Sequence, residues 1–192
     1  MINKTPFVIY SESTPNPSVM KFVANKNLTN TSKEAFNINE TKGWPLLESI
    51  FSLPFVKGIF ISGNYISIKK NDTVEWLEIT NYIRIFIQEK LNNNTPVVEE
   101  KYNHNLEVTK KDKKSNFHME VENIINTSIK PNIQMDGGDI ELVSCENGII
   151  KVFLKGACSG CPSSQMTLKN GIESLLQDTF PNKIKEVIAI NT

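Results

Sequence analysis

The chain has 192 residues, of which 39% are hydrophobic and 22% are charged, a composition typical of one folded domain or two small ones. Lysine plus arginine and aspartate plus glutamate number 21 each, so no overall basic field exists to hold a nucleic acid or an anionic membrane surface. No segment approaches the roughly 20 apolar residues of a membrane span, and residues 1–18 lack both a signal-peptide core and an arginine-rich amphipathic pattern. We therefore predict a cytoplasmic protein that binds neither nucleic acid nor membrane.

The first half of the chain combines strand patterns with two helix patterns. Gly63-Asn64 lies between two apolar runs and predicts a β-hairpin. No paired carboxylates, no nucleophile beside a base and no phosphate-binding loop occur in this half, so we expect it to serve recognition or support. The predicted strands cover residues 7–10, 20–23, 56–61 and 65–68, and the predicted helices cover residues 45–51 and 76–91.

Residues 95–116 have mixed charge and apolar residues without helical or strand period, which predicts a flexible linker. A lysine cluster lies near its end, and we favour a solvated linker over a patch for nucleic acid or an acidic partner. The linker divides the chain into a first domain at residues 1–94 and a second at residues 117–192. The cluster consists of Lys110, Lys111, Lys113 and Lys114.

The second half predicts the order helix-strand-strand-helix-strand. A helix at residues 117–129 is expected to end before Pro131, because the residue before a proline is disfavoured in helical conformation. The fold class is thus α+β, with two small α/β-sandwich-like domains. The remaining elements are predicted at residues 140–143, 149–155, 163–180 and 186–190.

The hairpin of this half is predicted to have a three-residue loop, Glu146-Asn147-Gly148, with Gly148 left-handed. This register turns Cys145 away from the main apolar layer. We therefore interpret Cys145 as a small apolar strand residue rather than a third ligand or a resolving thiol. The expected partners across the hairpin are Ile140 with Leu154, Leu142 with Val152, and Ser144 with Ile150.

Cys158 and Cys161 form a C-x-x-C motif, Cys158-Ser159-Gly160-Cys161. Three cysteines cannot make a disulfide framework, and an odd number favours thiol or metal chemistry. Pro162 suits the first position of a helix, which makes Cys161 the expected cap. Both sulfurs would then lie near the positive end of the helix dipole, a placement that favours thiolates.

Three functions remain open for this motif. A structural zinc site needs four ligands, which Cys145 with His104 or His118 could complete. A thioredoxin-like dithiol also follows a strand and starts a helix, but here the strand belongs to a hairpin rather than to a βαβ unit, and no later strand carries a proline. An iron–sulfur cluster commonly takes four thiolates, which a symmetric dimer would supply from two copies of the loop.

Several motifs extend well beyond the two cysteines. With them the second half resembles the NifU-like, or Nfu-type, iron–sulfur scaffold family, and the first half is similar to the N-terminal domain often joined to it. The second half carries Asp136-Gly137-Gly138-Asp139, the segment from Gly156 to Ser164, Thr167-Leu168-Lys169 and Gly171-Ile172-Glu173. The first half carries Thr14-Pro15-Asn16-Pro17, Lys21-Phe22 and the segment from Gly58 to Asn64.

The resemblance implies a [4Fe-4S] cluster bound between the two subunits of a homodimer by Cys158 and Cys161. It also implies that the cluster is handed to apo iron–sulfur client proteins, and that the chain is not an enzyme. For the first domain two roles stay open, selection of clients and docking of upstream assembly factors. For residues 136–139 we favour a tight turn before a strand over a part in shaping the cluster loop.

Overall fold

The computed structural model describes residues 5–99, 102, 115–159 and 162–190, with only the backbone described for residues 162–165. The contacts divide the chain into two compact units, Met1–Thr109 and Lys110–Thr192. Most of the expected linker lies outside the described residues, so its boundaries at 95 and 116 stay a prediction. No helix in the described part of the chain is long and apolar enough to cross a membrane.

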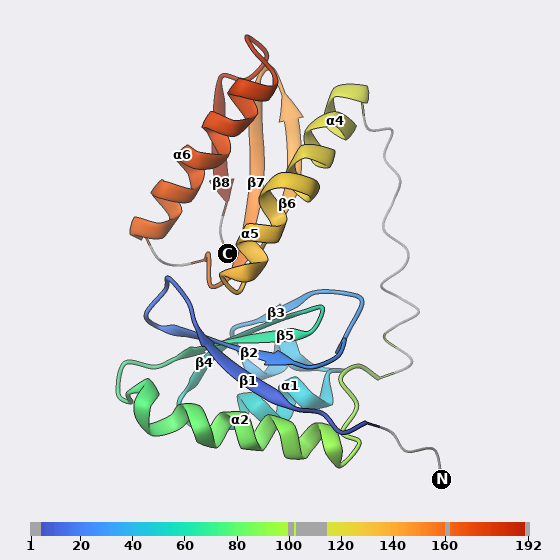
Figure 1. The fold of residues 1–192 in the computed structure, drawn as a ribbon, viewed down its shortest axis with the longest axis vertical. Coiled ribbons are helices and arrows are strands. Elements are labelled where there is room, and N and C mark those ends of the chain that lie inside the picture. The colour runs from blue at the N-terminus through green and yellow to red at the C-terminus, as the bar shows by residue number, and fades with distance from the viewer. Residues whose placement is uncertain (1–4, 100–101, 103–114, 160–161, 191–192) are drawn as a thin grey trace. The chain divides into compact units, whose positions relative to one another are not determined.

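The first unit is built on a five-stranded sheet in the order β1-β2-β5-β4-β3, in which all neighbours are antiparallel (Figure 1). The four predicted strands are confirmed as β1, β2, β4 and β5. β3 was not predicted, because three residues are too few to show an alternating pattern. The strands are β1 (Ile9–Ser13), β2 (Val19–Ala24), β3 (Lys33–Ala35), β4 (Val56–Ser62) and β5 (Tyr65–Lys70).

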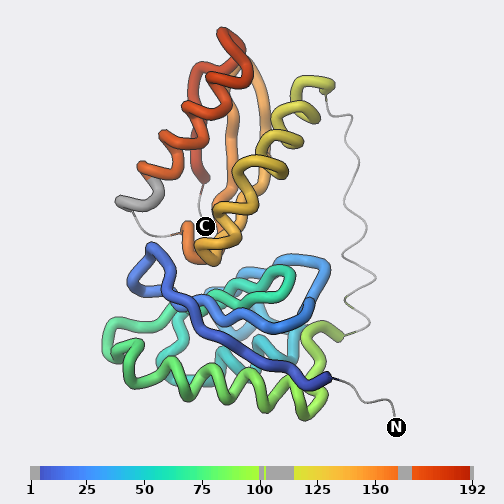
Figure 2. The backbone as a smooth tube through the Cα atoms, viewed as in Figure 1, coloured from blue at the N-terminus to red at the C-terminus, as the bar shows by residue number. Residues whose placement is uncertain are grey.

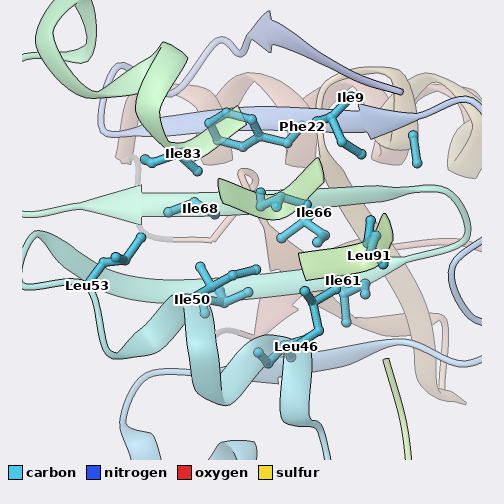
Figure 3. Close-up of a cluster of buried hydrophobic side chains, with 14 of the residues drawn as sticks. Ile9, Phe22, Leu46, Ile50, Leu53, Ile61, Ile66, Ile68, Ile83 and Leu91 are labelled. Atoms are coloured by element: carbon cyan, nitrogen blue, oxygen red, sulfur yellow. The ribbon is translucent and has the colours of Figure 1, made fainter. Parts of the chain in front are cut away.

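Two α-helices, α1 (Pro45–Phe51) and α2 (Trp76–Asn92), cover one face of this sheet, as the sequence predicted, and a short 3₁₀ helix, η1 (Ile38–Thr41), precedes them. Trp76 donates from Nε1 to the carbonyl of Pro17 at 2.9 Å and so ties α2 to the turn before β2. The buried side chains of strands and helices point toward one another in a single cluster (Figure 3). Those labelled are Ile9, Phe22, Leu46, Ile50, Leu53, Ile61, Ile66, Ile68, Ile83 and Leu91.

The second unit has a three-stranded sheet in the order β6-β7-β8, with β6 and β7 antiparallel and β7 and β8 parallel. Helices cover one face, and the unit has its own buried cluster. The predicted order helix-strand-strand-helix-strand is confirmed. Its elements are β6 (Gly138–Glu146), β7 (Ile149–Gly156), β8 (Glu186–Ile190), α4 (Asn116–Ile124), α5 (Lys130–Met135) and α6 (Pro162–Thr179).

The first helix of this unit does not end before Pro131, so the predicted boundary at residue 129 is wrong. A π-helical turn, η2 (Ile125–Ile129), joins α4 to α5, and the chain coils on through Met135 (Figure 2). The backbone N–H of Lys130 donates to the carbonyl of Ile125, five residues back. This wider turn directly before Pro131 lets a residue without an N–H sit inside a continuing helix, where a regular α-turn would clash with the ring.

The hairpin loop has two residues rather than the predicted three. Asn147 and Gly148 have φ of 53° and 80°, the combination that a type I′ turn requires. The partners of Ile140 and Leu142 are as predicted, but a β-bulge follows Leu142 and pairs Cys145 with Ile150. The bulge shifts the pairing by one residue, so the predicted register holds before the bulge and not after it. Cys145 therefore packs against the apolar cluster of the second unit instead of turning away from it.

Candidate functional site

Cys158 lies in a tight turn between β7 and α6. The turn begins at Gly156, whose φ of +65° bends the chain out of the strand. The carbonyl of Gly156 accepts from the backbone N–H of Ser159 at 3.1 Å and from its hydroxyl at 2.9 Å. The N–H of Ala157 donates to the carbonyl of Gly137 at 3.1 Å, which fastens the turn to the start of β6.

The sulfur of Cys158 lies directly against Gly138. A Cβ atom built on Gly138 would overlap the Cys158 Sγ and would stand only 2.9 Å from the carbonyl oxygen of Lys155. Gly137, with φ of +81°, makes the turn expected for residues 136–139. The predicted turn is thus confirmed, and two of its residues, Gly137 and Gly138, contact the turn that holds Cys158 and form the cysteine pocket with it.

Burial and nearby negative charge work against the thiolate of Cys158. The residue is 9% exposed. Its burial, followed by the negative charges of Asp136 and Asp139, raises the pKa of Cys158 to about 12. Burial and the two carboxylates therefore oppose the thiolate that the helix start is expected to favour. A metal that binds this sulfur must displace the proton.

A buried ion pair lies behind the pocket. Lys130 Nζ is 3.1 Å from Asp139 Oδ1, and the Asp139 side chain is 3% exposed. The same carboxylate oxygen accepts from the N–H of Ile140 at 2.9 Å. The pair joins α5 to β6 beside the cysteine turn, and sequence reasoning missed it, because no spacing rule pairs residue 130 with residue 139.

Cys161 lies outside the described residues, so its distance from Cys158 stays undescribed. Helix α6 begins at Pro162, as predicted. The helix is anchored to β8, because Glu173 Oε2 accepts from the N–H of Val187 at 2.8 Å.

The residues of the zinc alternative do not come together in the described part of the chain, which holds no group of three or more His, Cys, Asp or Glu able to bind a metal ion. Cys145 is half-buried in β6, and burial followed by the charge of Glu146 raises the pKa of Cys145. His118 lies in α4, where its Nε2 is buried without a described partner. His104 lies outside the described residues.

One ground against the dithiol alternative was wrong. β7 pairs with β6 in a hairpin, but it also pairs in parallel with β8 through α6, so the cysteine turn does lie in a βαβ crossover. The second argument against a dithiol was that no later strand carries a proline, and it holds for β8.

Comparison with known proteins assigns both halves of the chain. Residues 121–188 match the model of the NifU-like domain, and residues 9–94 match that of the N-terminal domain of scaffold protein Nfu/NifU. The second unit therefore contains a NifU-like domain, and the first contains a domain of the type found at the N-terminus of scaffold protein Nfu/NifU. The turn that holds Cys158 and the start of α6 lie inside the matched part of the second unit.

The chain is also similar to named relatives along nearly its whole length. It is 31% identical over 183 residues to the protein of Drosophila persimilis named NFU1 iron-sulfur cluster scaffold homolog, mitochondrial, covering 94% of this chain and 64% of the relative. It is 33% identical over 176 residues to the protein of the same name from Drosophila ananassae, covering 90% of this chain and 61% of the relative. The chain thus spans less than two thirds of the length of these relatives.

Among solved structures, the solution structure of a NifU-like protein from Saccharomyces cerevisiae matches with 21% identity and a TM-score of 0.43. The match covers 52% of this chain and 91% of the yeast one.

The prediction of a cytoplasmic location is contradicted by the relatives, which are named mitochondrial. The prediction rested on the lack of a signal-peptide core and of an arginine-rich amphipathic pattern in residues 1–18, and on the lack of a membrane span.

Proposed function

We propose that the chain is a carrier that holds a [4Fe-4S] cluster between two identical subunits and passes it to apo-proteins. Cys158 and Cys161 of each subunit supply the ligands, and the cluster is cargo rather than a resident cofactor. The observation that carries this proposal is the position of Cys158, in a turn that contacts Gly137 and Gly138 at the start of α6, inside the segment that matches the NifU-like domain. The relatives are named iron-sulfur cluster scaffold homologs, which supports it.

The number of sulfurs favours a shared cluster. The sequence has three cysteines, and Cys145 packs against the apolar cluster from β6. The C-x-x-C motif then leaves two sulfurs for each chain, whereas a cubane cluster commonly takes four thiolates. A second subunit, related by a two-fold axis, supplies the other two thiolates when the two copies of the turn come together. Ligands on a turn between two subunits also suit a cluster that must be released again.

Cysteine replacement tests the assignment. Cys158→Ala and Cys161→Ala should each abolish the visible absorbance of a cluster after anaerobic reconstitution with ferrous iron and sulfide, while far-ultraviolet circular dichroism stays unchanged. Cys145→Ala is the matched control and should load like the unchanged protein. Undiminished cluster absorbance in either motif variant would remove that cysteine from the ligand set.

A dithiol reductase is the second candidate, because the cysteine turn lies in a βαβ crossover. Such an enzyme needs an accessible thiolate of lowered pKa, and burial raises the pKa of Cys158 instead. An insulin reduction assay in iron-free buffer separates the two functions. We expect no reduction above the background of the reductant, and turnover that Cys158→Ala abolishes would favour the reductase.

We propose partner contacts as the role of the first unit. The described part of this unit has its own buried core, and selection of client proteins or docking of upstream assembly factors both fit a separate folded unit. Deletion of residues 1–94 should leave cluster loading unchanged and slow transfer to a client protein.

A further inference from the structure

A groove runs between α5 and α6 on the helical face of the second unit. Its volume is about 270 Å³, and its lining includes Ile133, Asp136, Leu168 and Leu175. Ile133 is buried at 2% exposure and forms part of the floor, whereas Leu175 remains 37% exposed at the side. The groove is therefore a hollow with a largely apolar lining and four polar lining residues, Ser128, Asn132, Asp136 and Thr167.

Gly171 lines the same groove from the middle of α6. A glycine in the interior of a helix destabilises it by about 1 kcal/mol relative to alanine. Nothing in the described part of the chain explains this glycine, because no described atom comes within 4 Å of the position that a Cβ would take. The open space suits the close approach of a group from outside the unit.

The size of the groove indicates what it accepts. Sites for small molecules usually measure about 300–1,000 Å³ and bury most of their ligand, so a smaller open groove suits one or two protein side chains better. Two methionines are sequence neighbours of lining residues: Met135 directly precedes Asp136, and Met166 directly precedes Thr167. They are 73% and 68% exposed, so both side chains are available for a contact with another molecule.

We propose that the groove and its two methionines form the contact surface for a second copy of this chain, with the methionines of each subunit entering the groove of the other over Gly171. A two-fold interface is self-complementary, and here the groove would supply the hollow and the exposed Met135 and Met166 the side chains that enter it. The inference rests on the proposed function, since the shared cluster would bring this end of the domain to the axis. The groove is continuous with the cluster turn, because Asp136 lines it and its charge also acts on Cys158.

Gly171→Ala tests the contact, with Asn170→Ala as the matched control. Both changes raise helix propensity in α6, but only Gly171 lines the groove. Both variants should therefore unfold at a slightly higher temperature. Only Gly171→Ala should weaken the cluster-loaded dimer, by about tenfold or more in sedimentation equilibrium, because an added methyl group overpacks the contact.

A second pair of variants tests the methionines. Met135→Gln with Met166→Gln should weaken the loaded dimer similarly, whereas Met119→Gln, at an exposed methionine of α4, should not. A loaded dimer of unchanged strength in Gly171→Ala and in the double methionine variant would overturn the contact and leave the carrier function standing. An unchanged protein that forms no cluster-bound dimer would instead overturn the proposed function, and the contact with it.

Discussion

At the scale of single residues, the cysteine pocket depends on a glycine. The pattern of the sequence was sufficient to single out Cys158 and Cys161 and to predict Pro162 as the first residue of α6. It was not sufficient to reveal the contact between Gly138 and the Cys158 sulfur, because that contact joins the first residue of β6 to a turn beyond β7. Contacts of this kind become visible only when the hairpin register is known.

Gly138→Ala should therefore damage the pocket. We expect the second unit to lose about 1–3 kcal/mol of unfolding free energy, the usual cost of overpacking, and cluster loading to fall. In the background of Cys158→Ala the cost should be smaller, because the overlapping sulfur is absent and only the contact with the Lys155 carbonyl remains. Urea unfolding followed by far-ultraviolet circular dichroism measures both costs.

The chain provides an internal control for this experiment. Trp44 and Trp76 are its only tryptophans and both lie in the first unit, so tryptophan fluorescence reports that unit alone. Its transition should be the same in all the Gly138 variants. Equal costs of Gly138→Ala with and without the Cys158 side chain would show that the sulfur does not press on Gly138.

The thiol of Cys145 should react slowly. Burial, followed by the charge of Glu146, raises the pKa of this half-buried cysteine. In the variant Cys158→Ala/Cys161→Ala it is the remaining thiol, and its alkylation should be slower than that of glutathione at pH 8. The rate should rise about tenfold per pH unit as the thiolate fraction grows.

The sign of the same shift applies to stability. The folded state holds the Cys145 proton more tightly than the unfolded chain does, because the pKa of Cys145 is higher in the folded state. The resulting contribution to the free energy of unfolding is complete below the pKa of the unfolded chain. It is lost as the pH rises through the pKa of the folded state. Glu146→Gln should speed alkylation. A rate equal to that of glutathione at every pH would show that Cys145 is neither buried nor affected by Glu146.

At the scale of elements, periodicity predicted most helices and strands, because each buries one apolar face and therefore repeats every two or every 3.6 residues. The two main errors came from local irregularities that periodicity cannot show. The β-bulge after Leu142 shifts the register by one residue, and the π-helical turn before Pro131 lets the helix continue. Both irregularities lie in segments that flank the cysteine pocket.

The ion pair between Lys130 and Asp139 should hold α5 against β6. Lys130→Met removes the partner of a carboxylate that is almost fully buried, so we expect the second unit to lose about 1–3 kcal/mol of unfolding free energy. Asp139→Asn should cost less, because the Lys130 side chain is 28% exposed and its charge can reach water.

The double variant Lys130→Met/Asp139→Asn should recover part of the loss, since it leaves no buried charge unpaired. Urea unfolding followed by circular dichroism provides the comparison. Additive losses in the double variant would show that the two side chains do not stabilise one another.

At the scale of the whole molecule, the chain consists of two units with separate buried clusters. Composition predicted this division, because a polar segment without period interrupts two stretches that each hold a complete amphipathic pattern. The compartment was predicted wrongly, because the prediction relied on recognising a targeting pattern in residues 1–18, and composition elsewhere in the chain does not distinguish one compartment from another. The function of the first unit could not be predicted either, because no short sequence motif in it indicates one.

The mass of the cluster-loaded protein tests the central claim most directly. Native mass spectrometry of the full chain after anaerobic reconstitution should show two chains with one [4Fe-4S] cluster, and Cys158→Ala should remove that species. A single chain that carries a complete cluster would contradict the account, because all the ligands would then come from one subunit.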